Sequence, residues 1–237
     1  MHRILKVKTI PQIGPKCTGS VIVLHGAGGS GPSLRSWWIS ELGREVQFEH
    51  LRVLFPTAVP IHYTPAQLLW HAWIDRVDTD INAPEIIPSI DDAVDSLTQL
   101  IDLEVDRGIP LNRIIIGGFS MGGTVALHIG YRSRRAVAGV FAMSSFLNHN
   151  SILYSHLDEY NKNKDEQQQH VRLPPLFQSH GKTDVTVHYD WGRETYAQLT
   201  KRQVKGEFMS VADCEHELHS EVLHRLDKWI TSILPPL

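Results

Sequence analysis

The sequence predicts an α/β fold with a mostly parallel central sheet and helices on both faces. Short apolar runs bounded by turn residues recur along the chain, and residues 21–24, 113–116 and 138–143 are apolar with little alternation. Such runs are typical of strands that are buried on both faces of a parallel sheet. Segments with helical spacing lie between them, and this alternation of strand and helix indicates one sheet wound with helices.

The expected strands, in chain order, are residues 21–24, 51–55, 113–116, 138–143, 176–179 and 207–211. Helices are expected where apolar residues recur every three or four positions, from Ile86 to Val105 and from Leu218 to Ile230. Because the pattern continues along the chain, we expect residues 1–237 to form a single domain.

Residues 149–175 interrupt this pattern. Within them, residues 161–170 contain no apolar side chain, and Pro174-Pro175 closes the segment before the next strand. The strand pattern resumes beyond it. We therefore expect a polar, flexible surface excursion and not a linker between domains.

Composition and charge exclude several classes of protein. The 237 residues are 42% hydrophobic and 21% charged, as in ordinary soluble globular chains. With 23 basic and 26 acidic residues, the chain lacks the charge that a nucleic-acid partner would require. Two cysteines make no disulfide framework, and no run reaches the roughly 20 apolar residues of a membrane span. We expect a cytoplasmic protein without stable membrane insertion, and its oligomeric state stays open.

A candidate nucleophile stands at the centre of the chain. Residues 118–122 match Gly-x-Ser-x-Gly around Ser120, directly after an expected strand and before the helical spacing of residues 124–129. This strand-to-helix setting holds a serine on a strained turn with its hydroxyl exposed. A phosphate-binding loop is the alternative, but no lysine follows Gly122-Gly123 as a P-loop requires. We predict that Ser120 is a nucleophile.

The base and the orienting acid are expected in the order Ser, Asp, His along the chain. Asp184 follows the expected strand at residues 176–179, and His216 follows the strand at residues 207–211, so both lie in loops where α/β sheets collect functional groups. We predict Asp184 as the acid and His216 as the base. Asp190 and Asp213 are the alternative carboxylates, and we expect both to be solvated.

A glycine-rich loop at residues 26–31 indicates the other half of the site. Its backbone N–H groups can turn inward without obstruction by side chains, which suits an oxyanion hole. We predict the amides of Ala27 and Met121 as the two donors. A dinucleotide-binding loop is a poor alternative, because no acidic residue closes the strand at residues 51–55.

A metal site is the alternative suggested by the 14 histidines. His216-Glu217-Leu218-His219 is one residue short of His-Glu-x-x-His, and the other histidines are scattered. We therefore expect no metal ligands, and we expect His180, His219 and His224 to have structural roles.

The combined motifs resemble the acyl-protein thioesterase and lysophospholipase family of α/β-hydrolases. Besides the serine motif, the resemblance is carried by Leu24-His25-Gly26, Gly29-Ser30-Gly31, Phe55-Pro56-Thr57-Ala58, Trp73-Ile74-Asp75, His180-Gly181-x-x-Asp184 and Glu215-His216-Glu217. It implies the α/β-hydrolase fold and a serine hydrolase that cleaves acyl thioesters or oxyesters through a Ser120, Asp184 and His216 triad. It further implies acylated small molecules or S-acylated proteins as substrates, with no metal or organic cofactor.

The sequence departs from the family pattern at three positions that bear on the site. Gly29 stands where the family usually has an acid, Met121 where the thioesterases have Gln, and Phe146 where they have Trp. For the acyl group we predict a lining of apolar residues near the expected site: Leu34, Leu69, Trp73, Phe146 and Leu147. We expect residues 63–73 to form a loop that acts as a partial lid.

Several functional alternatives remain at this point. A short-chain carboxylesterase or a lysophospholipase could use the same triad without any role on acylated proteins. A catalytically silent binding protein could keep the fold, although an intact triad counts against this reading.

Overall fold

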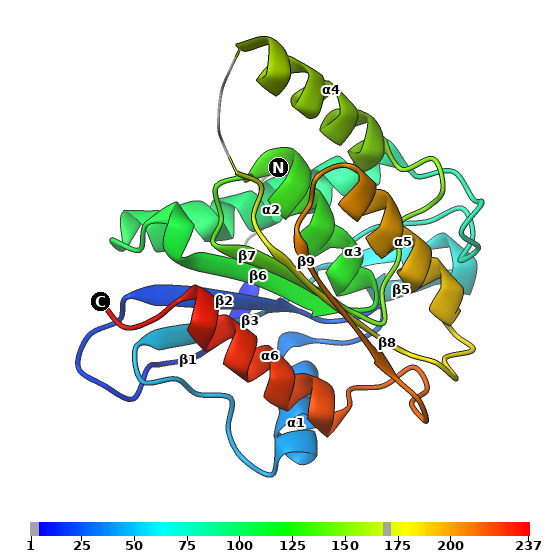
Figure 1. Ribbon diagram of the computed structural model, residues 1–237. Helices are drawn as coiled ribbons and strands as arrows, with labels where there is room; N and C mark the ends of the chain where they lie inside the picture. The colour runs from blue at the N-terminus through cyan, green and yellow to red at the C-terminus, as the bar shows by residue number, and fades with distance from the viewer. Residues whose placement is uncertain (1–4, 168–171) are drawn as a thin grey trace.

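The computed structural model describes residues 5–167 and 172–237, which contain a seven-stranded sheet in the order β1-β3-β2-β6-β7-β8-β9 (Figure 1). Its strands are β1 (Lys6–Ile10), β2 (Gly19–Leu24), β3 (Leu51–Thr57), β6 (Ile114–Phe119), β7 (Gly139–Met143), β8 (Leu176–Gly181) and β9 (Gly206–Val211). Only the edge strand β1 runs antiparallel to its neighbour in this sheet.

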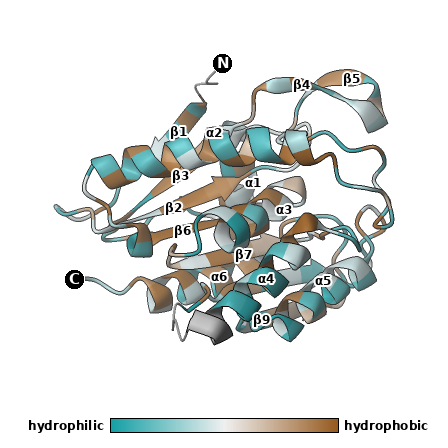
Figure 2. Cartoon of the chain, turned by 90° about the horizontal axis from the view of Figure 1, so that it is seen from above, coloured by the Kyte–Doolittle hydropathy of each residue, from teal (hydrophilic) through white to brown (hydrophobic). Residues whose placement is uncertain are grey.

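Helices cover both faces of the sheet, as the sequence predicts. The helices α1 (Gly31–Leu42) and α6 (Ser220–Ile233) lie on one face, and α2 (Ile87–Asp106), α3 (Met121–His128), α4 (Ile152–Gln167) and α5 (Tyr189–Lys201) lie on the other (Figure 1). Each face buries its own hydrophobic cluster. Figure 2 shows the inner strands β2, β3 and β6 as apolar ribbons, whereas α4 is largely hydrophilic.

The six expected strands and the two expected helices are present, and the structure adds three strands. The edge strand β1 alternates charged and apolar residues and pairs with β3. A separate hairpin consists of β4 (Pro60–Tyr63) and β5 (Leu68–His71), joined through a short 3₁₀ turn at Thr64–Ala66. The expectation of a loop at residues 63–73 is therefore wrong for Tyr63 and Leu68–His71, which pair in this antiparallel ribbon, and it holds for the residues between and after them.

The segment expected to be an irregular excursion is mostly helical. The helix α4 extends to Gln167, so the prediction of a loop is wrong for residues 161–167, and residues 168–171 lie outside the described part of the chain. Leu153 and Leu157 are fully buried in the cluster that α2 and α3 also join, and they fix the first turns of α4. The amide of Asn161 then donates to the carbonyl of Arg202, and the polar residues that follow are mostly favourable in helices.

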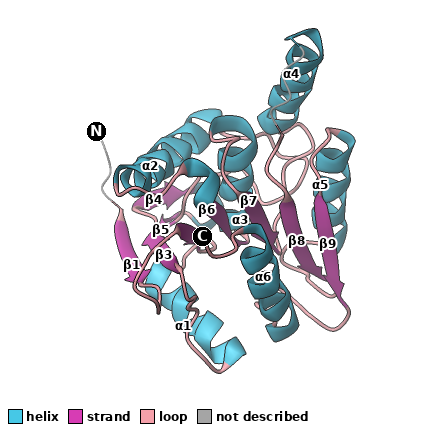
Figure 3. Ribbon diagram, turned by 60° about the vertical axis from the view of Figure 1, so that its left-hand side comes forward, coloured by secondary structure: helices cyan, strands magenta, loops and turns pink. Residues whose placement is uncertain are grey.

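The topology brings five loops to one edge of the sheet. Because β2, β6, β7, β8 and β9 are parallel neighbours, the segments that follow their carboxyl ends share that edge. Figure 3 shows these strands as one twisted layer between the helices. Among the described residues, no helix is long and apolar enough to cross a membrane.

Candidate active site

Ser120 lies on a strained turn between β6 and α3. Its φ of 53° and ψ of −124° fall in a region that non-glycine residues rarely adopt. A Cβ at Gly118 would lie 2.5 Å from the carbonyl oxygen of Leu24, and a Cβ at Gly122 would lie 2.3 Å from the same oxygen. The two glycines therefore allow β2 to approach closely, and the turn presents the Ser120 hydroxyl at the sheet edge.

The structure brings Ser120, His216 and Asp184 into one hydrogen-bonded chain. The Nε2 atom of His216, in the loop between β9 and α6, lies 3.0 Å from Ser120 Oγ. Its Nδ1 atom lies 2.8 Å from Oδ2 of Asp184, which comes from the loop between β8 and α5. With Nδ1–H donating to the carboxylate, Nε2 is left as the acceptor for the serine hydroxyl.

The Asp184 carboxylate is buried and fully engaged. Its Oδ1 accepts the backbone N–H groups of Thr186 at 3.0 Å and Val187 at 2.8 Å, while Oδ2 faces His216. Burial by itself raises the pKa of Asp184, but hydrogen bonds from His180, His216 and Val187 outweigh it and hold this pKa well below its usual range. Asp184 is therefore ionised wherever the protein is folded near neutral pH.

A second histidine, His180, also faces Asp184. Its Nε2 lies 2.8 Å from the carbonyl oxygen of Val187 and 3.4 Å from Asp184 Oδ2, and its side chain is fully buried. Since a carbonyl only accepts, Nε2 must carry the proton. The sequence predicts a buried structural role for His180, and no sequence signal indicates that it touches the same carboxylate as His216.

Asp190, one of the alternative acids, lies outside this chain of hydrogen bonds, and Cys214, two residues before His216, is not activated as a nucleophile. Asp190 is on α5, largely exposed and paired with Arg193 at 3.0 Å. Cys214 is buried, and burial raises the pKa of its thiol to about 11, so it is not a thiolate at neutral pH.

Ala27 and Met121 line the same cavity as Ser120. Met121 is the first residue of α3, so its N–H has no partner within the helix. The glycine-rich loop is held to the end of β5, where the N–H of Gly28 donates to the carbonyl of His71, and it is closed internally by the N–H of Gly29, which donates to the carbonyl of Gly26. The two residues predicted to supply oxyanion donors therefore line the same cavity as Ser120.

The side chain of His25 fixes the glycine-rich loop through hydrogen bonds at both ring nitrogens. Its Nδ1–H donates to the Gly26 carbonyl at 2.7 Å, and its Nε2 accepts the N–H of Ala58 at 3.0 Å. The indole of Trp73 donates to the His25 carbonyl at 2.8 Å. Burial lowers the pKa of His25 to about 4, so the ring is neutral at pH 7 and can accept from Ala58.

A cavity of about 430 Å³ opens at Ser120 and His216. Its wall includes Arg76 and three threonines, and otherwise it is mainly apolar. The apolar and aromatic lining consists of Ala27, Tyr63, Pro65, Ala66, Trp70, Phe119, Met121, Phe146 and Val187. The β4–β5 hairpin and its turn contribute four of these residues, so the segment expected to act as a lid forms one wall.

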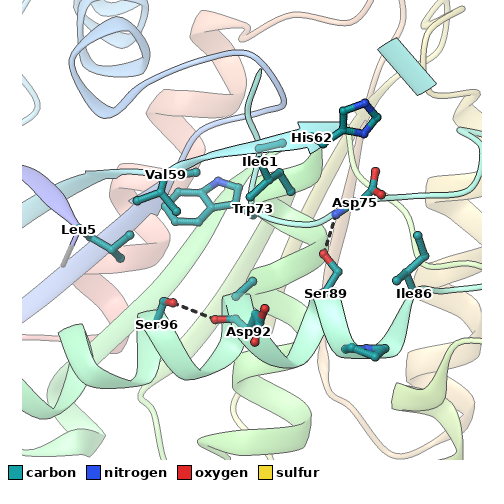
Figure 4. A pocket seen from close by; sticks show the side chains of 14 residues that line it. Leu5, Val59, Ile61, His62, Trp73, Asp75, Ile86, Ser89, Asp92 and Ser96 are labelled. Carbon is teal, nitrogen blue, oxygen red and sulfur yellow. Dashed lines mark hydrogen bonds between the residues drawn. The ribbon is translucent and has the colours of Figure 1, made fainter. Parts of the chain in front are cut away.

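Only Phe146, of the five residues predicted to line an acyl site, lies in this cavity. Leu34 and Leu147 are buried in the two cores, and Leu69 is 75% exposed on β5. Trp73 lines a different cavity of about 270 Å³, between the hairpin and α2 (Figure 4). The prediction is wrong for these four, because periodicity and proximity in sequence do not tell which side of a strand or hairpin faces the site.

The chain is similar to known proteins over nearly all of its length. Residues 8–234 match the phospholipase/carboxylesterase family model. The chain is 42% identical to mouse lysophospholipase-like protein 1, over 92% of this chain and 88% of the relative. It is 29% identical to acyl-protein thioesterase 1 of Neurospora crassa, over 92% and 88% of the two chains.

The fold also matches a solved structure, maize acyl-protein thioesterase 2, with a TM-score of 0.79 and 21% identity, over 97% of this chain and 99% of the other. The chain thus belongs to the phospholipase/carboxylesterase family and is a serine hydrolase with the α/β-hydrolase fold.

Proposed function

We propose that the protein hydrolyses acyl thioesters and oxyesters with Ser120, His216 and Asp184 as its catalytic triad. The observation that carries this proposal is the unbroken chain of hydrogen bonds from Ser120 Oγ through both nitrogens of His216 to Asp184. The strained turn at Ser120 supports it, since strain of this kind is found where a nucleophile must be presented.

The first step forms an acyl-enzyme. Ser120 Oγ attacks the acyl carbonyl while Nε2 of His216 takes the hydroxyl proton, and Asp184 stabilises the resulting imidazolium. The amides of Ala27 and Met121 donate to the developing oxyanion, at the positive end of the α3 dipole. His216 then protonates the leaving thiol or alcohol.

Water completes the cycle. His216 takes a proton from a water molecule, the hydroxide attacks the acyl-enzyme carbonyl, and the same proton returns to Ser120 as the carboxylic acid leaves. The mostly apolar wall of the cavity gives the acyl group less polar surroundings than water, in which the hydrogen bonds of the oxyanion donors are stronger.

We further propose acylated substrates for this site, either S-acylated proteins or acylated small molecules. The names of the related proteins, a lysophospholipase-like protein and acyl-protein thioesterases, support this class. Cys17 and Cys214 of this chain are both free, as is usual for proteins of a reducing compartment. We therefore propose that S-acylated protein substrates would be met in the cytoplasm.

The test is labelling with a fluorophosphonate probe, followed by a series of esters and thioesters of increasing acyl length. We expect labelling and hydrolysis by the wild type, loss of both in Ser120→Ala, and retention of both in Ser36→Ala. Ser36 is a suitable control because it is exposed on α1, away from the cavity. Labelling that persists in Ser120→Ala would contradict the assignment of the nucleophile. Hydrolysis confined to short acyl chains would contradict the proposed role on acylated proteins, but the proposed esterase activity would stand.

A further inference from the structure

Arg76 places a buried positive charge in the wall of the catalytic cavity. The residue is 8% exposed and follows the β4–β5 hairpin. Its Nη2 donates to Thr124 Oγ1 at 3.2 Å, and its Cζ lies 4.7 Å from the centre of the Phe146 ring. Both of these neighbours line the same cavity as Ser120. The guanidinium group itself, and not only its aliphatic stem, therefore lies at the cavity wall.

The side-chain partners found for this guanidinium in the described part of the chain are neutral. Besides Thr124, Nη1 makes a long contact of 3.5 Å with Oδ1 of Asn148. Glu85 is the nearest carboxylate along the backbone, as the two residues form an isolated antiparallel bridge. Its Oε2 accepts the N–H of Ile152 at 2.9 Å, and its Oε1 lies 3.4 Å from His128 Nε2 without a hydrogen bond. No ion pair joins Glu85 to Arg76 in the described residues.

Such an arrangement leaves capacity for an anionic ligand. Arginine carries five N–H donors in a planar fork that matches a carboxylate, and a buried charge is costly unless it is paired. A structural arginine in a core satisfies this need with a protein carboxylate. The nearest contacts of Arg76 are instead the face of an aromatic ring and uncharged oxygens. Glu85 acts on Arg76 only through its charge, which together with Tyr63 opposes the lowering of the Arg76 pKa by burial.

We propose that Arg76 binds a carboxylate carried by the substrate, so that the site prefers esters and thioesters with a carboxylate near the reacting carbonyl. This inference rests on the proposed hydrolase function and names its substrate class. Thr124 is four residues beyond Ser120, about 6 Å along α3. A carboxylate at Arg76 would thus lie about two to four carbons from the carbonyl attacked by Ser120, on the acyl part or on the leaving group. A substrate without this carboxylate would make no ion pair with Arg76 and would meet only the apolar wall of the cavity.

The experiment compares matched pairs of esters. For the acyl part, the p-nitrophenyl ester of glutaric acid is compared with the same ester whose free carboxylate is methylated. For the leaving group, the butyryl ester of 4-hydroxybenzoic acid is compared with that of its methyl ester. The rate measured with Ser120→Ala is subtracted as background. The quantity of interest is the ratio of kcat/KM for the anionic ester to that for its neutral partner.

In the wild type we expect this ratio to exceed one in one of the two arms, and that arm identifies the position of the carboxylate. In Arg76→Gln the ratio falls roughly tenfold to a hundredfold, the worth of a hydrogen-bonded charge pair. Arg76→Lys retains part of the preference because it keeps the charge. Arg193→Gln is the control, since it removes an exposed arginine on α5 and leaves the ratio as in the wild type.

Two results would overturn the inference while leaving the hydrolase intact. One is Ser120-dependent hydrolysis of the neutral esters with no preference for either anionic ester. The other is a loss in Arg76→Gln that is equal for anionic and neutral esters, as a purely structural arginine would give. If Arg76→Gln does not fold, protection of wild-type Ser120 from the fluorophosphonate decides: glutarate must protect at lower concentration than glutaramide. Absence of any Ser120-dependent hydrolysis would instead contradict the proposed function.

Discussion

At the residue scale, motif chemistry anticipates more of the site than composition does. Ser120, Asp184 and His216 could be placed from the sequence because each follows a recognisable strand, and parallel strands deliver their next residues to one edge. Arg76 could not be found, since it follows a hairpin that the sequence does not reveal. The contact of His180 with Asp184 was equally hidden, because it depends on how one short loop folds back.

A methyl group at Gly122 should disrupt the turn around Ser120. In Gly122→Ala the Cβ would meet backbone atoms of Leu24 and His25 at 2.3 to 2.7 Å, so strand and helix must move apart. We expect a loss of about 1–3 kcal/mol in the free energy of unfolding, with a fall in kcat of tenfold or more. Gly43→Ala is the control: it has a positive φ but nothing within 4 Å, and should cost only about 1 kcal/mol with unchanged kcat. Equal effects on kcat would contradict the steric explanation.

Removal of the second histidine should change the pH dependence of catalysis. In His180→Ala, Asp184 loses a donor that lowers its pKa, so its charge is less neutralised and stabilises protonated His216 more. The acidic limb of the profile of kcat/KM against pH should therefore move to higher pH, with a lower kcat. His224→Ala, which changes an exposed residue of α6, serves for comparison. A lower kcat with an unmoved limb would mean that His180 only supports packing.

At the scale of elements, buried strands were predictable and amphipathic pieces at the margins were not. The runs in β2, β6 and β7 are apolar on both faces, a pattern that few other structures produce. The hairpin β4–β5 has no such signal, because β5 is exposed along its length and pairs only with β4. The polar second half of α4 likewise resembles a loop in composition, and only the anchoring of its first turns makes it helical.

The anchoring of α4 can be tested by truncating one buried side chain. Leu157 is fully buried in the shared cluster, so Leu157→Ala should lower the free energy of unfolding by about 2–5 kcal/mol. Glu159→Ala, on the exposed side of the same helix, should change it by less than about 0.5 kcal/mol. Urea denaturation followed by circular dichroism measures both. Similar values for the two variants would show that α4 is not fixed by this contact.

At the scale of the whole molecule, one edge of the sheet unites segments from residue 27 to residue 216. The family match over residues 8–234 extends across the same span. Stability and catalysis therefore share groups. The loop that contains Ala27 is held by His25, whose neutral ring donates to the Gly26 carbonyl and accepts the N–H of Ala58, the residue after β3. What the sequence left undetermined is the direction in which side chains face, and hence the lining of the cavity.

This sharing predicts that acid unfolds the protein in a defined pH range. The pKa of His25 falls from 6.5 in the unfolded chain to about 4 in the folded protein, so the unfolded state binds more protons between these values. The contribution of neutral His25 to the free energy of unfolding is therefore fully present above pH 6.5. It is lost as the pH falls to 4, which lowers the free energy of unfolding by about 3 kcal/mol. Buried His128, whose pKa is also lowered, acts in the same direction. Asp184 contributes only below its unfolded value of 3.8.

Urea unfolding measured at intervals between pH 7.5 and pH 4 tests this expectation. The denaturant midpoint of the wild type should fall steeply below pH 6.5. His25→Asn should be less stable at pH 7 and show a shallower decline, because it has no ring to protonate and an amide can replace only part of the hydrogen bonding. His62→Asn is the matched control, since His62 is exposed on β4 and its replacement should leave the wild-type slope. An unchanged slope in His25→Asn would show that other groups govern the acid limit and that the loop bearing Ala27 is held independently of His25.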